Sequence, residues 1–410
     1  MSRPYRALIL VENLPVPFDR RVWLEATTLT RHGYEVTVIC PKGKGFDRSR
    51  EEIEGVQIYR YGLPFDGRSS LGFAAEFAWA FTATSALSLR AALFGRGFDV
   101  VQACNPPDMF WLLGRFWKLF GCRFIFDHHD LSPEMYSVKF GHGDGFLRRA
   151  LLWLERRSFR AADVVITTNE SHKAIAVQRG GKTPDDVFVV RSGPDLARFR
   201  VFPPDPRYFA GKRHLLVYLG EMCAQDGVDN LVRALKLLRD THGRDDFHCV
   251  FVGGGPHQPA IKAYTDAEGV ADIATFTGTV SDDELCRILS SATIGVDPAP
   301  KNDWSTKSTM NKIIEYMFFG LPVVAFDLGE TRVSAADAAL YAQPNSEAAM
   351  ARMLDALLDD PVRREEMATI GRARVRDTLA WNHSEAPLLA AYAKALRPRT
   401  SPVSARPATR

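Results

Sequence analysis

The segment KSTMNKIIEYMFFGLPVVAF (residues 307–326) holds a complete helix-and-strand unit and decides the class of fold. Ser308 or Thr309 can cap a helix there, because a side-chain hydroxyl accepts a hydrogen bond from a free amide of the first turn. The apolar face of this helix repeats at helical spacing and consists of Ile313, Ile314, Met317 and Phe318. Gly320 and Pro322 end the helix before a buried strand. The segment predicts a layered α/β domain.

Short apolar runs alternate with longer amphipathic segments along the chain, in two series. The first series of strands is expected at 7–11, 35–40, 99–103, 123–127, 163–167 and 187–190. The second is expected at 214–219, 247–252, 274–276, 293–296, 322–326 and 339–341. Strand–helix alternation with short connections predicts parallel sheets joined by right-handed crossovers. We therefore predict two doubly wound, Rossmann-like α/β domains that face each other across a cleft.

The boundary between the two domains is expected where the strand–helix pattern stops. Residues 195–214 show no periodicity and carry three prolines within four positions, as is typical of a linker. We assign residues 1–200 to the first domain and 201–380 to the second. A last helix over 381–396 is expected to pack back toward the first domain. The tail 397–410 has almost nothing to bury and is expected to be disordered.

Composition excludes several classes of protein. The chain has 410 residues, of which 46% are hydrophobic and 25% charged, with a net charge of +3; these values are ordinary for a soluble protein and too weakly basic for a bulk nucleic-acid binder. Six separate cysteines argue against a zinc module or a disulfide framework and favour a reducing cytoplasm. The longest uncharged stretch, about 77–89, is shorter than the roughly 20 residues of a membrane span. We expect no transmembrane segment.

Small or ionisable residues follow nearly every predicted strand. In the first domain Asn13 follows the first strand and Asp108 the third, whereas Gly220 and Glu330 follow the first and fifth strands of the second domain. Ligands of open parallel sheets bind beyond the carboxyl ends of the strands, so these residues are candidates for the cleft. Because polar turns occur in every protein, this pattern alone favours a functional cleft only modestly.

Lysines and hydroxyls gather at the start of the predicted helix in residues 307–326. Lys307 and Lys312 bracket that start, where the helix dipole already favours an anion. Glu315 lies three residues beyond Lys312, and the remaining polar residues of the turn are Ser308, Thr309 and Asn311. This arrangement suits a nucleoside diphosphate, with amides and lysines on the phosphates and Glu315 on the ribose hydroxyls. The simpler alternative is a Lys–Glu pair on the surface, of small energetic value.

The segment GGGP (253–256) ends one strand and precedes a helix. In this position the amides of Gly253, Gly254 and Gly255 can approach a phosphate. An equally good interpretation is a tight strand-to-helix turn. The dinucleotide fingerprint is incomplete, and the first strand of the chain has no glycine loop, so a Rossmann dehydrogenase is disfavoured.

The segment DHHDLSPE (127–134) places two histidines and acids at a strand end. His129 and Asp130 are the candidate catalytic residues, since a histidine there could bind a sugar or stabilise charge. The competing interpretation is a histidine that pairs with Asp127 or Asp130 to hold the loop. No Asp-x-Asp sequence occurs in the chain, which argues against a metal-held nucleotide.

Taken together, these segments resemble the family 4 (group 1) retaining glycosyltransferases, which have the GT-B fold of two facing Rossmann-like domains. The resemblance spans residues 6–396, and the order and spacing of the segments are specific where single segments are not. The segments that carry it are RHGYEVTVICP (31–41), FDHHDLSPE (126–134), FVVRSGPDLARF (188–199), VYLGEMCAQDGVDNLVRAL (217–235), FVGGGP (251–256), FTGTVSDDEL (276–285) and NKIIEYMFFGLPVVAFDLGE (311–330).

The resemblance implies a hexosyltransferase that uses a nucleoside diphosphate sugar and retains the anomeric configuration. Glu315 matches the family's second motif glutamate, which holds the donor ribose, His129 matches the histidine that touches the donor sugar, and Val280 matches the segment that recognises the base. No metal or other cofactor is implied. A glycan or lipid-linked acceptor for polysaccharide or cell-surface glycan synthesis would lie against the first domain, near Asn13, Arg20, Arg21 and Asp108.

The chain departs from the family pattern at its cations. Lys307 stands where the first motif glutamate is usual, and Glu221 and Asp226 stand where an arginine and a lysine usually clamp the diphosphate. These departures indicate a divergent branch in which Lys307, Lys312 and Arg20 or Arg21 supply the positive charge. The alternatives are a non-catalytic sugar-nucleotide-binding or scaffold protein of the same fold, or a sugar-nucleotide epimerase.

The expected location is the cytoplasm. Peripheral contact with the inner face of the membrane is a further expectation, because the segments 110–120 and 146–159 are rich in aromatic and arginine side chains. A core helix with a basic outer edge would give the same pattern. No nucleic-acid partner is expected.

Overall fold

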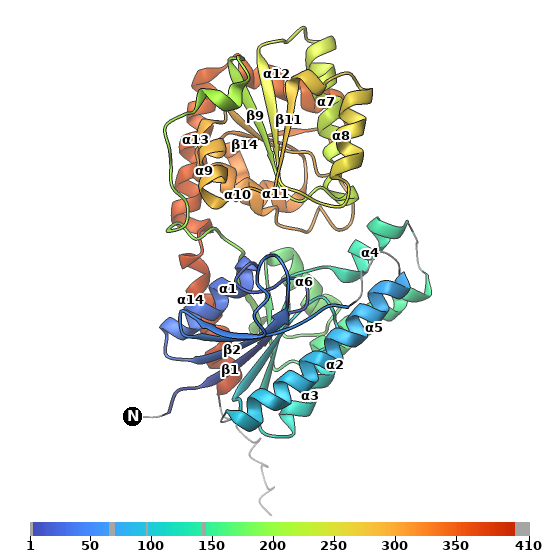
Figure 1. Ribbon diagram of the computed structural model, residues 1–410, viewed down its shortest axis with the longest axis vertical. Coiled ribbons are helices and arrows are strands. Elements are labelled where there is room, and N and C mark those ends of the chain that lie inside the picture. Colours follow the sequence, from blue (N-terminus) through green and yellow to red (C-terminus); the bar gives the residue numbers. More distant parts are fainter. Residues whose placement is uncertain (1–2, 65–69, 96, 142–144, 398–410) are drawn as a thin grey trace, which may run out of the picture.

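The computed structural model describes residues 3–64, 70–95, 97–141 and 145–397, and it forms two lobes that lie one above the other (Figure 1). The tail expected to be disordered lies outside the described residues from position 398 onward. Each lobe contains one sheet with helices on both faces (Figure 1). The predicted pair of doubly wound sheets is confirmed.

The N-terminal sheet has eight strands in the order β3-β4-β2-β1-β5-β6-β7-β8. Every neighbouring pair is parallel except β3 and β4, which form an antiparallel edge hairpin. This hairpin was not expected from the sequence, because REEI alternates charged residues and carries little apolar signal. The bounds are β1 Arg6–Leu10, β2 Glu35–Pro41, β3 Arg50–Ile53, β4 Val56–Tyr61, β5 Val100–Cys104, β6 Arg123–His128, β7 Val164–Thr167 and β8 Val187–Val189.

The C-terminal sheet has six parallel strands in the order β11-β10-β9-β12-β13-β14. The order reverses at β9, so the carboxyl ends of β9 and β12 flank the crevice where open parallel sheets bind ligands. The bounds are β9 His214–Leu219, β10 Phe247–Val252, β11 Ala274–Gly278, β12 Ile294–Asp297, β13 Val323–Phe326 and β14 Ala339–Ala342.

Helices bury both faces of each sheet, and the alternation along β1 shows how. Ala7 and Ile9 belong to one apolar core of the N-terminal lobe, whereas Leu8 and Leu10 belong to the core on the opposite face. The N-terminal helices are α1 Arg20–Arg31, α2 Ser70–Phe94, α3 Trp111–Lys118, α4 Ser132–Phe140, α5 Phe146–Ala161 and α6 Glu170–Gln178. The C-terminal helices are α7 Val228–Asp240, α8 Gln258–Ala267, α9 Asp282–Ser291, α10 Asn311–Phe318, α11 Gly329–Ala335, α12 Glu347–Leu358 and α13 Pro361–Arg374.

The last helix, α14 (Asn382–Leu396), leaves the C-terminal lobe and packs in the N-terminal one (Figure 1). Leu388 and Tyr392 are fully buried in the core beneath the N-terminal sheet. Trp381, just before the helix, donates its indole N–H to the Thr28 hydroxyl of α1 at 2.9 Å. The chain therefore crosses between the lobes twice, once near residue 200 and once near residue 380.

Helix α2 bears on the expectation that the chain has no transmembrane segment, which stays a prediction. Within the described residues, its portion Ala75–Phe94 is long and apolar enough to cross a membrane by length and composition alone, and 22% of its most apolar window is buried. Its buried stripe consists of small residues, Ala80, Thr84, Ser88 and Ala91. Phe81 and Leu87 also pack against the core that contains Leu8 and Leu10, whereas the exposed large side chains are Trp79, Leu89, Leu93 and Phe94. The helix thus lies on the N-terminal sheet through one face and presents several large apolar groups outward.

Candidate functional site

A cavity of about 380 Å³ lies between the lobes and is lined by residues from both. The N-terminal lobe contributes the predicted residues Asn13, Arg20, Arg21, His129 and Asp130. The C-terminal lobe contributes the predicted residues Ser308, Thr309 and Asn311. Sequence reasoning missed the other lining residues, among them Thr168 and His172, although the polar run after β7 marks the place of these two. Residues nearly 300 positions apart thus meet in this interdomain cavity.

A second space of about 190 Å³ adjoins the interdomain cavity and contains Glu315. Both spaces are lined by Arg20, Arg21, Ser192 and Asn311. Burial raises the pKa of the Glu315 carboxyl to about 7, against the opposing effect of Arg198. Glu315 therefore changes charge near neutral pH, which bears on any ligand hydroxyl that it binds.

Direct contacts between the lobes fix the width of the cleft. The Asn169 side-chain amide of α6 donates to the Lys307 carbonyl at 2.9 Å and to the Thr309 hydroxyl at 3.0 Å. The Ser171 hydroxyl donates to Glu330 at 2.5 Å. Lys307 thus contributes its backbone to a domain contact, and Glu330 is a residue of the same contact.

The start of α10 differs from the prediction. The helix begins at Asn311, with Met310 as N-cap and no side-chain cap, so the predicted caps Ser308 and Thr309 are wrong. The Ser308 hydroxyl instead donates to the Trp304 carbonyl at 2.8 Å, because residues 302–308 form turns of their own before the helix. The Ser308 and Thr309 side chains line the interdomain cavity nonetheless.

Lys312 points toward the strand ends of the C-terminal sheet. Its ammonium lies 3.6 Å from the Asp297 carboxylate and 3.4 Å from the Tyr218 hydroxyl, and its side chain is 9% exposed. Although burial opposes the charge, Tyr218, Asp297 and Asp226 raise the pKa of Lys312. The alternative of a surface Lys–Glu pair is therefore wrong. Asp226 belongs to this charge cluster and also accepts from the Cys223 amide at 3.2 Å.

The glycines at the strand ends allow two loops to touch. A Cβ at Gly253 would lie 2.0 Å from the Gly220 carbonyl, and one at Gly255 would lie 2.6 Å from Met222. The Gly253 amide donates to the Gly278 carbonyl at 2.9 Å, so in this structure it is not free to bind a phosphate. The tight-turn interpretation accounts for Gly253, while phosphate contact by Gly254 and Gly255 stays a prediction. Val280 is half-buried in the loop after β11.

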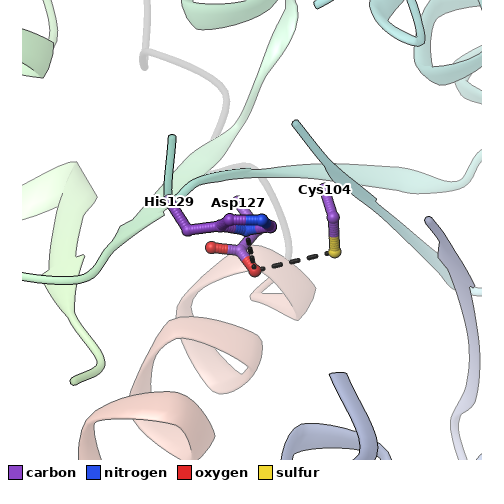
Figure 2. Close-up of side chains that lie close together, drawn as sticks. All are labelled: Cys104, Asp127 and His129. Atoms are coloured by element: carbon purple, nitrogen blue, oxygen red, sulfur yellow. Dashed lines mark hydrogen bonds and ion pairs between the residues drawn. The ribbon is translucent and has the colours of Figure 1, made fainter. Parts of the chain in front are cut away.

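A buried carboxylate orients His129. The Asp127 carboxylate lies 3.4 Å from the His129 Nδ1 atom, with Cys104 on its other side (Figure 2). Although burial opposes the charged imidazolium, Asp127 raises the pKa of His129 to about 9. His129 is therefore protonated at neutral pH. The interpretation that a histidine pairs with Asp127 describes this geometry, and the paired ring also lines the interdomain cavity.

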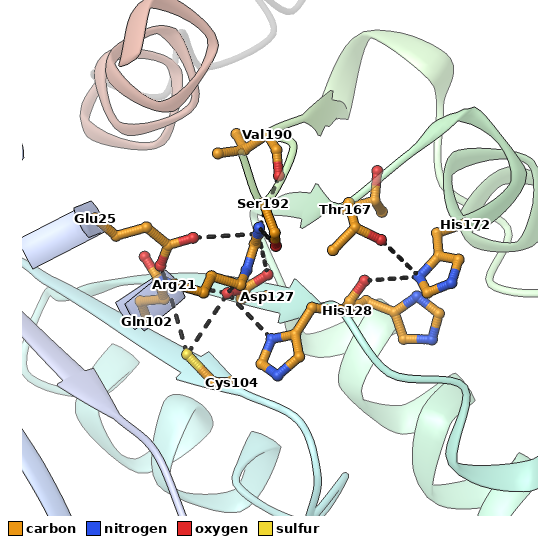
Figure 3. Close-up of polar contacts among 12 residues, drawn as sticks. Arg21, Glu25, Gln102, Cys104, Asp127, His128, Thr167, His172, Val190 and Ser192 are labelled. Atoms are coloured by element: carbon orange, nitrogen blue, oxygen red, sulfur yellow. Dashed lines mark hydrogen bonds and ion pairs between the residues drawn. The ribbon is translucent and has the colours of Figure 1, made fainter. Parts of the chain in front are cut away.

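Arg21 lies beneath the cleft at the centre of a charge network (Figure 3). Its guanidinium makes two hydrogen bonds to Asp127, at 2.8 and 3.1 Å, and approaches Glu25 at 3.1 Å. Gln102 donates to Glu25 at 2.6 Å and accepts from the Tyr392 hydroxyl at 2.6 Å. The side chain of Arg21 is only 8% exposed and its charge is compensated by buried acids, while its place on the acceptor side of the cavity stays a prediction.

Within the described residues, Cys104, Asp127 and His129 are spaced as metal ligands would be. The donor set does not suit a metal, however. Arg21 already binds both oxygens of Asp127. Burial also raises the pKa of the Cys104 thiol well above its ordinary value, so no thiolate is present to act as a ligand.

Arg20 lies at the edge of the interdomain cavity, whereas Asp108 lies outside it. Arg20 pairs with Asp282 of the C-terminal lobe at 3.2 Å, so it bridges the lobes at the edge of the cleft. Asp108 does not line the interdomain cavity. It is buried in the N-terminal lobe, where it lines a separate cavity and accepts from the Asn105 amide at 3.3 Å.

Two family models match the chain, one in each lobe. The model described as "Glycosyl transferase 4-like domain" matches residues 19–193, and that described as "Glycosyl transferases group 1" matches residues 213–360. The chain is also similar to the 2-deoxystreptamine glucosyltransferase of Streptomyces kanamyceticus, at 25% identity over 252 residues. That match covers 59% of this chain and 63% of the relative, less than two thirds of its length.

Solved structures share the fold across nearly the whole chain. Sucrose-phosphate synthase from Thermosynechococcus elongatus superposes with a TM-score of 0.74 at 20% identity, covering 96% of this chain and 99% of the other. Anabaena Alr3699/HepE, solved in complex with UDP and glucose, gives a TM-score of 0.70 at 13% identity, covering 95% and 99%.

Proposed function

This chain belongs to the group 1 (family 4) glycosyltransferases and has their GT-B fold, and on that premise we propose that it transfers a hexose from a nucleoside diphosphate sugar with retention of configuration. One observation carries the proposal. The interdomain cavity places His129, which is paired with Asp127, and Asp130 of one lobe opposite the turn at residues 308–311 of the other. A donor bound to the turn would present its sugar to the histidine.

The donor would lie along the start of α10. Free amides and the helix dipole favour the diphosphate at this point, and Ser308 and Thr309 line the same cavity. Glu315, in the adjoining space, would accept hydrogen bonds from the ribose hydroxyls. Similarity to a structure solved with UDP supports a nucleotide in this fold. Lys312 would balance the charges of Asp297 and Asp226 beneath the diphosphate.

The chemistry would rely on charge stabilisation and positioning. The bond from the anomeric carbon to the diphosphate breaks, and the acceptor oxygen attacks from the same face while its proton passes to a diphosphate oxygen. The protonated His129 would stabilise the negative charge that develops beside the donor sugar, in a site already organised for it. Both oxygens of the Asp127 carboxylate already accept hydrogen bonds from Arg21. We therefore propose that the reaction needs no metal, and EDTA should leave turnover unchanged.

The acceptor would lie against the N-terminal lobe, as part of polysaccharide or cell-surface glycan synthesis in the cytoplasm. The large exposed apolar side chains of α2 and α5, such as Phe94 (84% exposed) and Phe146 (76% exposed), support contact with the inner face of the membrane. Exposed apolar patches of this kind mark interaction surfaces. A lipid-linked or oligosaccharide acceptor would then meet the donor in the cleft.

A screen of nucleotide sugars tests the proposal. UDP-, GDP- and dTDP-sugars are added to the protein, and the correct donor should raise its melting temperature, because a ligand that binds only the folded state stabilises it. Product formed from that donor should keep the anomeric configuration, as read by proton NMR. Failure of all three nucleotide classes to bind would contradict the proposal.

A non-catalytic or epimerase role is the second candidate. Glu221 is exposed just after the end of β9. If a diphosphate binds there, the like charge of Glu221 would weaken its binding. Asp226 does not add to that repulsion, because Lys312 compensates it within the charge cluster. Sugar transfer to an acceptor by the pure protein would exclude a scaffold role, and conversion of the donor without any acceptor would indicate an epimerase.

A further inference from the structure

A cavity of about 320 Å³ lies wholly within the N-terminal lobe, apart from the donor site. It is bounded by the loop 105–109 and by helices α4 and α5. Its lining is mainly apolar and includes Met109, Leu151 and Leu154, and its polar side chains include Asp108, Asp130, Ser132 and Lys139. A few hundred cubic ångströms of mainly apolar lining with a few polar groups is typical of a small-molecule site.

The apolar cavity meets the interdomain cavity at Asp130. This residue lines both spaces, and it follows His129 directly in the chain. A molecule whose reactive group lies at Asp130 can therefore extend into the apolar cavity without crossing the donor site. The mouth on the other side is bordered by Leu147, which is 44% exposed and lines the cavity.

Two buried polar atoms in the wall of the cavity, the second Asp108 oxygen and the Ser132 hydroxyl, make no hydrogen bond of normal geometry. They lie close enough for Ser132 to oppose the effect of burial on the pKa of Asp108, whose first oxygen accepts from Asn105 at 3.3 Å. Asp108 is 3% exposed. An unpartnered buried polar atom is costly, so a ligand hydroxyl that reaches these two groups would be favoured. Despite the opposing effect of Ser132, burial raises the pKa of Asp108 to about 6.

We propose that this cavity binds the apolar portion of the sugar acceptor, so that the acceptor is an amphiphile rather than a purely hydrophilic oligosaccharide. Its reacting hydroxyl lies at Asp130, a second hydroxyl reaches Asp108 and Ser132, and its hydrocarbon part lies among the leucines of α5. Polar groups of Asp108, Ser132 and Lys139 in the lining can hydrogen-bond a hydroxylated head group. The inference rests on the proposed function for the identity of the ligand as acceptor.

Binding of n-alkyl β-D-glucosides, from butyl to decyl and below their micelle concentrations, tests the cavity without any nucleotide. Burial of one methylene is worth about 0.8 kcal/mol, which corresponds to about fourfold in affinity. We therefore expect the Kd, measured by isothermal titration calorimetry, to fall about fourfold per methylene and then level off once the cavity is full. A Kd that does not depend on chain length would overturn the proposal.

Two substitutions locate this binding. Ala150→Phe fills the cavity from α5, and Leu147→Asp places a charge at its mouth; each should abolish most of the chain-length dependence. Leu119→Asp is the matched control, because Leu119 is 82% exposed on α3 and does not line the cavity. Melting temperatures establish that each variant folds. Because Leu147 is partly exposed, Leu147→Asp should disturb folding less than Ala150→Phe. Chain-length dependence that survives both substitutions would contradict the assignment.

The outcomes separate this inference from the proposed function. If alkyl glucosides bind as expected but no nucleotide sugar does, the cavity is an amphiphile site and the glycosyltransferase proposal fails. If a nucleotide sugar is transferred equally well to butyl and octyl glucoside, with equal acceptor KM, the proposed function stands and the cavity assignment fails.

Discussion

His129 shows how one buried carboxylate changes the charge of a histidine in the cleft. Asp127 holds the imidazolium at 3.4 Å and is itself held by Arg21. Burial alone would raise the pKa of Asp127, but Arg21 and His129 lower it instead. The pair therefore stays ionised, and a positive charge faces the cleft at neutral pH.

The pH dependence of turnover should show this pairing. The kcat of the wild type should stay constant up to about pH 9 and fall above it, as His129 loses its proton. Asp127→Asn removes the charge that raises this pKa, so the fall should begin at lower pH. Its maximal rate should drop by about 10²-fold, the scale of one lost electrostatic contact. If kcat of the variant falls at the same high pH as kcat of the wild type, the pairing of His129 with Asp127 is ruled out.

Ionisation of Glu315 should control how donor binding changes with pH on the acid side of the profile. Its pKa of about 7 means that the ionised form, which accepts from ribose hydroxyls, develops between about pH 6 and 8. The kcat/KM for the donor, which reports the free enzyme, should rise through that range. Glu315→Gln cannot ionise and should give a flat profile with lower kcat/KM. A wild-type profile without this rise would remove Glu315 from the donor site.

At the scale of elements, the sequence predicted most strands because their apolar runs are buried on both sides. It misplaced the start of α10 because Ser308 bonds backward to Trp304, a turn that helix periodicity does not reveal. It also missed the β3–β4 hairpin, whose strand REEI is charged. The burial of Arg21 was missed as well, although Arg21 and Glu25 at i,i+4 spacing were a signal for an ion pair on α1.

Helix α14 is the element that connects the C-terminal lobe to the network under His129. Tyr392→Phe leaves the buried Gln102 carbonyl oxygen without its donor, which should lower the free energy of unfolding by about 1–3 kcal/mol. Urea unfolding followed by circular dichroism measures this. Lys394→Ala on the same helix removes a partly exposed ion pair with Asp186 and an exposed hydrogen bond to the Asp185 carbonyl, so it should change stability by less than about 0.5 kcal/mol. Equal effects of the two substitutions would contradict the role given to Tyr392.

At the scale of the molecule, the two-domain arrangement follows from repeated strand–helix alternation, and the cleft follows from polar residues at strand ends. The contacts that close it do not follow from the sequence. Asn169 reaches Lys307 and Ser171 reaches Glu330 only because the lobes pack at one particular angle. No local pattern specifies that angle, so the partners across the cleft required the structure.

The exposed apolar groups of the N-terminal lobe should bind membranes. Sedimentation with anionic vesicles should bring down the wild type, with less binding at high salt because exposed charges are screened. The double substitution Leu93→Glu and Phe94→Glu, at side chains that are 80% and 84% exposed, should weaken binding by at least about tenfold. Val201→Glu and Val362→Glu, at exposed sites outside this lobe's helices, serve as the control. If the α2 variant and the control bind vesicles equally well, the assigned membrane surface is contradicted.

The central claim is that a nucleoside diphosphate lies between the start of α10 and His129. Calorimetric titration of UDP, GDP and dTDP into the wild type and Glu315→Ala measures it directly. One nucleotide should bind the wild type, and Glu315→Ala should weaken it by about ten- to a hundredfold, the value of one or two hydrogen bonds to a charged group. Binding of none of the three, or equal affinity of both proteins, would contradict the claim.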